Sequence, residues 1–162
     1  MSELPFILFG QQHLFALVLS ALTIIYFPLY AKKKLSKDSQ EAIAKTLAIF
    51  LIVHELSRPF YRPYFFGDEL ILSFPLHACH LSAFSIAVYL LVRKKVFFEV
   101  AYYWGLGGGT MALLTPDITR AFPDIEWFPF FMGHVAMIMA IFFSMFCHNT
   151  YPSKHSFRRV VL

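Results

Sequence analysis

Apolar residues occur along the chain in five long runs that are separated by short polar connections. Runs of about 17–25 apolar residues are long enough to cross roughly 30 Å of hydrocarbon as helices. The runs do not alternate between apolar and polar positions, as the strands of a membrane barrel do, and a helix satisfies its backbone hydrogen bonds internally. The pattern predicts an all-α, polytopic membrane protein, one domain over 1–162, with transmembrane helices at 5–30, 42–57, 71–92, 96–114 and 127–147.

The composition agrees with a membrane protein. Of the 162 residues, 58% are hydrophobic and only 15% are charged, whereas about 25% of the residues of a soluble domain are charged. Aromatic residues make up 19% of the chain, and such residues are enriched at membrane interfaces. The net charge of +4 comes from basic residues in short loops. It therefore indicates orientation in a membrane, and we expect no nucleic acid partner.

Lysine and arginine gather on one side of the predicted bundle. The connections on that side, after the first, third and fifth spans, carry Lys32, Lys33, Lys34, Lys37, Lys45, Arg93, Lys94, Lys95, Lys154, Arg158 and Arg159. Cytoplasmic loops have an excess of such residues, so we expect a multi-pass protein of the cell membrane with its N-terminus outside and its C-terminus in the cytoplasm. The N-terminus lacks a basic region and an A-x-A-like cleavage site, which favours a retained span over a signal peptide.

The polar residues within the predicted spans share one depth, in the outer half of the bundle. They are His13, His54, Glu55, His77, Cys79, His80 and His134, with Asp117 just beyond the fourth span. Each has a simpler interpretation when it is taken singly: an interhelical hydrogen bond for His134, and an interfacial position for His13 or Glu55. However, an ionisable residue inside a span is costly without a partner. The common depth therefore favours one shared site.

The segment FPLHACHL, residues 74–81, places a cysteine between two histidines. On a helix, His77 and His80 are about 60° apart and can share a face, whereas Cys79 lies about 100° from His80. A buried cysteine is commonly a small hydrophobic residue, but a neighbouring imidazole can convert a thiol into a reactive thiolate. Cys147 lies at the opposite end of the fifth span without polar neighbours, and we interpret it as structural.

The glycines of WGLGGG, residues 104–109, are expected to serve helix packing. The run lacks the lysine of a P-loop and follows no strand, which argues against phosphate binding. Gly105 and Gly109 instead form a G-x-x-x-G face that allows close approach of a neighbouring helix. Asp117, beyond the end of this span, is placed to orient a histidine.

Four segments, FGQQHL, FPLHACHL, YYWGLGGGTMALLTPD and FPFFMGH, carry a family resemblance and together extend over most of the chain. In them the chain resembles the YwaF-like family of bacterial integral membrane proteins. That family is distantly similar to a eukaryotic transmembrane acyltransferase that uses a cysteine and a histidine to move fatty acyl chains between phospholipids. The resemblance implies that Cys79 is the acyl-accepting nucleophile and His134 its base. Members usually continue with further helices, so it also implies a truncated or minimal form.

The first hypothesis for function is a lipid acyltransferase or lipase that works in the outer leaflet. In this hypothesis His134 deprotonates Cys79, and the thiolate attacks an ester carbonyl of a membrane lipid. His13, His54, Glu55, His77, His80 and Asp117 would bind substrate or support the pair. No cofactor is needed.

Two alternatives stay open from the sequence. One is a metal-dependent membrane hydrolase in which His77, His80 and His134 hold zinc, because a catalytic zinc takes three protein ligands and a water. Asp117 or Glu55 would then be a further ligand. The other is a small transporter or sensor with a polar pocket and no catalysis.

Overall fold

The computed structural model describes residues 4–161, and within them the protein is all helical, which confirms the predicted class. Pro5 and Arg120 form an isolated bridge, but the described residues contain no β-strand. The elements in chain order are α1 (Gln11–Lys34), α2 (Lys37–Phe66), α3 (Leu70–Ser73), α4 (Ala78–Val92), α5 (Lys95–Val100), the π-helical turn η1 (Ala101–Gly105), α6 (Leu106–Leu114), α7 (Trp127–Cys147) and α8 (Ser156–Val161).

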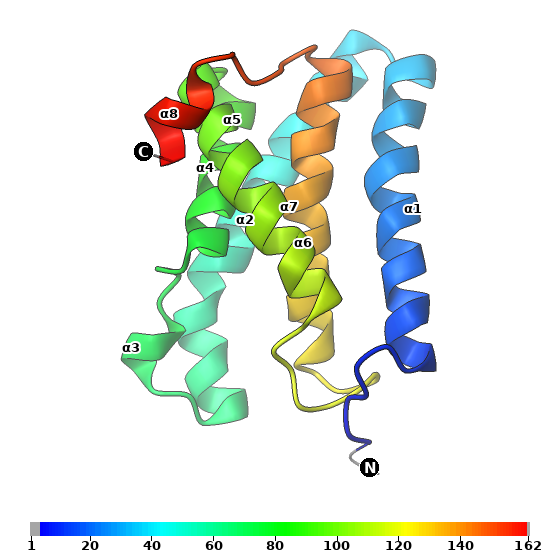
Figure 1. Ribbon diagram of the computed structural model, residues 1–162, viewed down its shortest axis with the longest axis vertical. Coiled ribbons are helices and arrows are strands. Elements are labelled where there is room, and N and C mark those ends of the chain that lie inside the picture. The colour runs from blue at the N-terminus through cyan, green and yellow to red at the C-terminus, as the bar shows by residue number, and fades with distance from the viewer. Residues whose placement is uncertain (1–3, 162) are drawn as a thin grey trace.

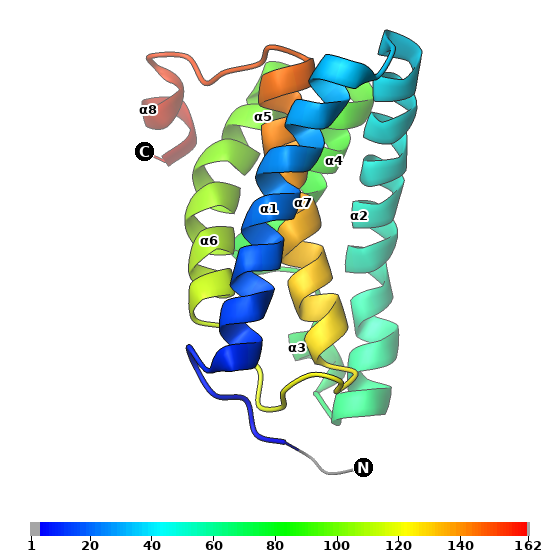
Figure 2. The same cartoon turned by 90° about the vertical axis from the view of Figure 1, so that its right-hand side faces the viewer.

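The helix α7 lies at the centre of the bundle. It packs against α1, α2, α4 and α6, and two perpendicular views show these helices arranged around it (Figure 1 and Figure 2). Its sequence is apolar on every side, as expected for a helix surrounded by other helices. Met137, Ile141 and Phe143 are among its completely or almost completely buried side chains. The residues of α7 are therefore the ones best placed to contact groups from several helices at once.

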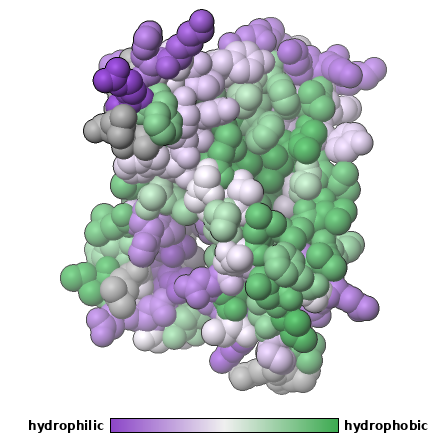
Figure 3. Space-filling view, in the orientation of Figure 1, coloured by the Kyte–Doolittle hydropathy of each residue, from purple (hydrophilic) through white to green (hydrophobic). Residues whose placement is uncertain are grey.

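The helix α1 buries only a narrow stripe. Its buried residues recur every three or four positions and are His13, Ala16, Ser20, Ile24, Pro28 and Ala31. The other sides carry exposed apolar side chains such as Phe15, which is 70% exposed, and Val18, which is 58% exposed. The same surface is the hydrophobic right-hand side of Figure 3. A helix with apolar residues all round and one buried stripe is what a lipid-facing helix presents.

Within residues 4–161, two helices, α1 and α7, have both the length and the hydropathy of a membrane span. The other predicted spans take different forms. The second lies within α2, which is 30 residues long and has charged residues near both ends. The fourth, 96–114, is the continuous helical stretch formed by α5, η1 and α6.

The third predicted span, 71–92, is divided at Pro75. Proline has no backbone N–H, and it drives the preceding residue into an extended conformation. Phe74 accordingly has φ −65° and ψ 140°. The chain leaves the short α3 there and α4 begins only at Ala78, so α4 has 15 residues. His77 is consequently the residue that precedes the helix and not part of its first turn.

The basic clusters lie together at one end of the bundle. The C-terminal ends of α1, α4 and α7 meet at the upper end in Figure 1. There Arg93 donates to Glu41 at 2.5 Å and to Nδ1 of His148 at 2.6 Å, so it connects α4 with α2 and with the residue that ends α7. The opposite end carries the turn at Gly67 (φ 72°), α3 and the start of α7.

Candidate functional site

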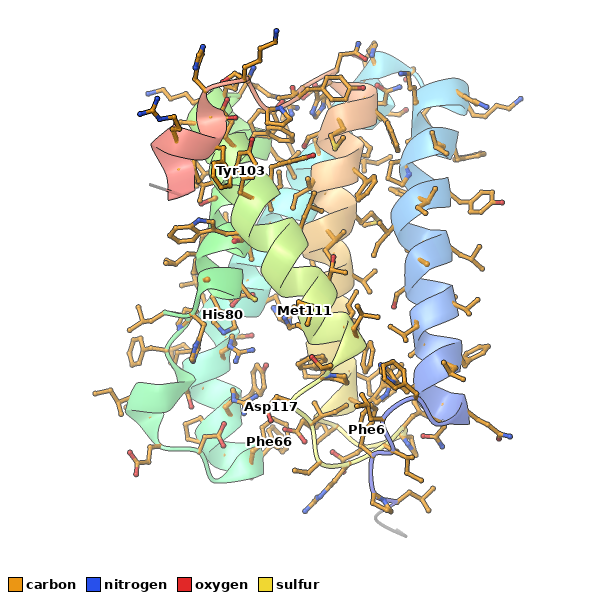
Figure 4. All side chains as sticks on the ribbon, viewed as in Figure 1. Phe6, Phe66, His80, Tyr103, Met111 and Asp117 are labelled. Carbon is orange, nitrogen blue, oxygen red and sulfur yellow. The ribbon has the colours of Figure 1, made fainter. Side chains whose placement is uncertain are left out.

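Two adjoining cavities lie where α2, α4 and α7 meet, in the lower half of the bundle. The inner cavity has a volume of about 10 Å³, which is room for about one water molecule, and the outer one has about 330 Å³. The residues that line both are Arg58, Cys79, His80, Pro129, Phe130 and His134. Figure 4 shows His80 and Asp117 in this region, on the side of the bundle away from α1, and Figure 3 shows hydrophilic residues gathered there.

Cys79 is the second residue of α4, and its side chain is partly buried. Its sulfur lies against α6, because a Cβ atom added to Gly108 would stand 3.0 Å from Sγ. Gly105, at the end of η1, and Gly109, in α6, bring this helical stretch close to α7, where added Cβ atoms would meet Ile141 and Met137. The glycines thus serve close packing, as the spacing predicts, and they also set the space around the thiol.

His134 is held in one ring orientation by its own helix. Its Nδ1 lies 2.8 Å from the carbonyl oxygen of Phe130, one turn earlier in α7. A carbonyl only accepts hydrogen bonds, so Nδ1 carries the proton and the neutral ring keeps its lone pair on Nε2. The ring also contacts that of Phe130, with centroids 4.6 Å apart. His134 therefore offers a basic Nε2 in the cavities that it shares with Cys79.

Glu55 is a buried carboxylate at the centre of the polar cluster, only 4% exposed. Its Oε2 lies 2.8 Å from Nδ1 of His80 and 4.0 Å from Nε of Arg58. The contact with His80 is close, although it lacks the alignment of a good hydrogen bond. Its Oε1 lies 3.3 Å from Nδ1 of His54. A buried charge needs such partners because leaving it alone in an apolar interior is costly.

His54 fastens α2 to α7. Its Nε2 donates to the carbonyl oxygen of Pro129 at 3.0 Å. Proline has no backbone N–H, but its carbonyl can still accept a hydrogen bond. The ring fits because residue 133 is glycine: a Cβ atom there would collide with the imidazole. The two ring nitrogens of His54 thus contact the carbonyl of Pro129 and the carboxylate of Glu55.

His77 and Asp117 belong to the outer cavity. The ring of His77 lies 5.7 Å from that of His80, so the two imidazoles are neighbours although His77 precedes the helix. Asp117 is exposed. Its carboxylate has no hydrogen-bond or ion-pair partner among the described side chains, so it does not orient a histidine in this structure.

His13 lies apart from the other polar residues. It accepts from the backbone N–H of Phe9 at 3.0 Å, and its Nε2 donates to the carbonyl oxygen of Leu113 at 2.9 Å. Its surroundings belong to a separate cavity beside Phe6 and Ala121, and Phe6 lies at the foot of α1 in Figure 4. Both ring nitrogens are occupied, so His13 fastens the N-terminal segment to α6. The sequence analysis included His13 in the shared site because of its depth in the bundle, but His13 lines a different cavity.

Arg58 is a site residue that the sequence analysis missed. It lines both cavities, and its Nε is buried without a hydrogen-bond partner among the described residues. Its spacing from Glu55 was the available indication, because residues three apart on a helix are neighbours. The carbonyl of Phe130 was also missed, since a backbone acceptor leaves no trace in the sequence.

The zinc alternative has no ready set of ligands in the part of the chain that the structure describes. No three His, Cys, Asp or Glu side chains there form a metal-binding group. Nδ1 of His80 faces Glu55 and Nδ1 of His134 faces Phe130, so each ring has one nitrogen left.

Comparison with known proteins places the chain in a family. The pattern of the TMEM164 family matches residues 8–162. The chain belongs to the TMEM164 family. This is a family of transmembrane proteins, which confirms the prediction of a membrane protein. The described surface of α1 agrees with that assignment.

The TMEM164 family member described here also has a bacterial relative. An uncharacterized protein of Treponema pallidum (strain Nichols) is 30% identical over 88 residues, which are 54% of this chain and 37% of the relative. The chain thus matches little more than a third of that protein's length. No solved structure matches the chain.

Proposed function

We propose that the protein is a lipid acyltransferase or lipase that uses Cys79 as nucleophile and His134 as base. The observation that carries the proposal is that both side chains line the same two cavities, while the carbonyl of Phe130 leaves Nε2 of His134 as the basic nitrogen. A nucleophile, a base and a third group that orients the base are the parts that thiol catalysis needs.

The reaction divides into two transfers. Nε2 of His134 removes the proton from Cys79, and the thiolate attacks the carbonyl carbon of a lipid ester. The ester oxygen leaves as a hydroxyl group, and Cys79 holds the acyl chain as a thioester. An alcohol then takes the chain in acyl transfer, or water takes it in hydrolysis, and the thiol is restored.

A membrane lipid is the substrate class that fits this position. The family is transmembrane, and the outer cavity, about 330 Å³, is lined by the ring of Phe130 as well as by polar side chains such as Arg58. The site lies at the end opposite the basic clusters, and these favour the cytoplasmic side. We therefore propose a YwaF-like, multi-pass protein of the cell membrane, with five spans, the N-terminus outside and the site in the outer leaflet.

The deciding experiment is mass spectrometry of the protein after incubation with diacyl phospholipid in nanodiscs. We expect one acyl chain on Cys79 in the wild type and none in Cys79→Ser. Cys147→Ser is the matched control, because Cys147 lies at the other end of α7 and its thiol faces the carbonyl of Pro28. It should keep the acyl adduct.

The same preparation tests zinc. Under the proposal, a chelator leaves lipid turnover unchanged. Full turnover by Cys79→Ser together with stoichiometric zinc, lost in His80→Ala, would instead assign the site to a metal-dependent hydrolase. An unacylated wild-type protein with neither property would favour a transporter or sensor.

A further inference from the structure

Two histidines of the site hold the same tautomer against different partners. Nδ1 of His134 faces a neutral carbonyl at 2.8 Å, and Nδ1 of His80 faces the carboxylate of Glu55 at 2.8 Å. Only the contact of His134 is aligned as a hydrogen bond. A carboxylate 2.8 Å away nevertheless attracts a proton as a carbonyl does, so in each neutral ring the proton lies on Nδ1. Each neutral ring therefore keeps a basic Nε2, and both rings line the cavities with Cys79.

The carbonyl beside His134 and the carboxylate beside His80 suit the two rings to different reactants, a thiol and a hydroxyl. A thiol has a pKa near 8.5, so it needs only a modest base, and in cysteine proteases a neutral amide suffices to orient the histidine. A hydroxyl gives up its proton much less readily. A histidine that serves a hydroxyl is commonly backed by a carboxylate, which stabilises the imidazolium that forms. His134 has the first kind of support and His80 the second.

We propose that Glu55 is a positioning residue that holds His80 as a second acid–base residue, and that His80 serves the oxygen atoms of the reaction while His134 serves the sulfur. This inference rests on the proposed acyl transfer. It adds a second proton carrier, which the Cys79 and His134 pair does not supply.

The proton balance is complete with the two rings. Each cycle starts with His134 neutral and His80 protonated at both nitrogens beside the carboxylate of Glu55. In the first transfer His134 takes the thiol proton, the C–S bond forms, the ester C–O bond breaks, and His80 gives its Nε2 proton to the departing oxygen. In the second, Nε2 of His80 takes the proton of the incoming hydroxyl, whose oxygen forms the new C–O bond. The C–S bond breaks, and the thiolate of Cys79 recovers its proton from His134.

The carboxylate of Glu55 keeps its position while His80 gains and loses a proton. Arg58 and His54 flank the carboxylate from its own helix, at 4.0 Å and 3.3 Å, and His54 is anchored to α7 through Pro129. The carboxylate is therefore fixed by contacts that do not include His80, as a positioning residue must be.

An activated ester separates the two roles. The p-nitrophenyl ester of a fatty acid releases nitrophenolate, which needs no proton, so its attack on Cys79 requires His134 alone. Later turnover, with n-octanol as acceptor in nanodiscs, requires His80 as base, after His80 has lost its Nε2 proton to the buffer because nitrophenolate did not take it. We expect His80→Gln to keep the rapid first release of nitrophenolate, to lower steady turnover by about 10²-fold or more, and to accumulate acyl-Cys79 by mass spectrometry. His134→Gln should slow the first release itself.

Two further variants test Glu55. Glu55→Gln keeps an acceptor but removes the charge, so we expect the same pattern as His80→Gln with a smaller loss. Glu41→Gln is the matched control, because Glu41 also lies beside a histidine, His148, but at the other end of the bundle. Unchanged turnover in His80→Gln, or loss of the first release without accumulation of acyl-Cys79, would overturn the division of roles.

A spectroscopic measurement on the wild-type protein tests the role of Glu55 without any variant and without turnover. Nitrogen NMR of ring-labelled wild-type protein should show the proton of His80 on Nδ1, and an unprotonated Nδ1 would overturn the assignment of Glu55. If the wild type shows no first release at all, the proposed acyl transfer itself is wrong, and the role of His80 falls with it.

Discussion

Gly108 lies so close to Cys79 that a Cβ atom on the glycine would stand 3.0 Å from the sulfur. The helix α6 thus covers one side of the thiol with bare backbone. At the neighbouring Gly107 an added Cβ atom would meet nothing within 4 Å. Gly107 and Gly108 are therefore adjacent on α6, but only Gly108 lies against the sulfur of Cys79.

The variant Gly108→Ala should slow the reaction of Cys79. Its methyl group would push the sulfur or α6 aside, and crowding of this kind costs about 1–3 kcal/mol. We expect alkylation of Cys79 by an apolar maleimide, followed by mass spectrometry, to fall several-fold. Gly107→Ala is the control and should react as the wild type does. Equal rates in both variants would show that α6 does not confine the thiol.

A second prediction concerns the choice between the two cysteines. Cys79 shares its cavities with His134, whereas Cys147 is buried beside the carbonyl of Pro28. A fatty acyl probe with a thiol-reactive group should therefore label Cys79 in preference to Cys147. The variant His134→Ala should weaken the labelling by about 10²-fold, the lower end of the range of general base catalysis. Equal labelling of both cysteines, unaffected by the histidine, would leave Cys79 as a packing residue.

The sequence was sufficient to predict the helical class, and it singled out most of the polar side chains that line the two cavities, because both depend on composition and periodicity. Long apolar runs specify helices in lipid, and the spacing in FPLHACHL brings His77 and His80 to one face. Glu55 was also recognisable, since an acidic residue within a span needs partners. What the sequence lacks is the identity of those partners.

The remaining parts depend on contacts between distant segments. His13 has the same depth as His80, yet its two hydrogen bonds tie it to Phe9 and Leu113. The fit of Gly133 around His54 joins residues on different helices, and no periodicity reports it. The third predicted span ran unbroken over 71–92, whereas the structure shows a complete break at Pro75, before α4 begins at Ala78.

The contact between Gly133 and His54 gives a third prediction. A methyl group at position 133 would collide with the imidazole, so Gly133→Ala should lower the free energy of unfolding by about 1–3 kcal/mol. His54→Ala makes room for the methyl group. The double variant should therefore lose less free energy of unfolding than the two single variants lose together. A double-mutant cycle in detergent measures this difference. Additive losses would contradict the contact.

The fourth prediction concerns orientation. Three basic clusters lie at one end of the bundle, and such clusters stay in the cytoplasm. A reporter fused to the C-terminus should read cytoplasmic, and one inserted at Gly67, at the opposite end, should read outside. The reverse result would move Cys79 and His134 to the inner leaflet, and the outer-leaflet substrate would have to be given up.

The last prediction is a pH dependence at the other end of α7. Burial first, and then the neighbouring guanidinium of Arg93, lower the pKa of His148 from 6.5 to about 4, while Glu41 opposes this change and Lys37 adds to it. The neutral ring accepts from Arg93 at 2.6 Å. Below pH 6.5 the unfolded chain takes up a proton at this residue that the folded protein does not, so the free energy of unfolding falls as the pH drops from about 6.5 to about 4.

Thermal unfolding in detergent at several pH values measures this effect. His148→Gln keeps a polar side chain but cannot titrate, so its unfolding temperature should fall less between pH 7 and pH 5 than that of the wild type. His155→Gln is the control, because His155 is exposed at the same end, and it should keep the wild-type dependence. If His148→Gln followed the wild-type curve, burial and Arg93 would not hold the ring of His148 neutral. Another group would then have to cause the pH dependence.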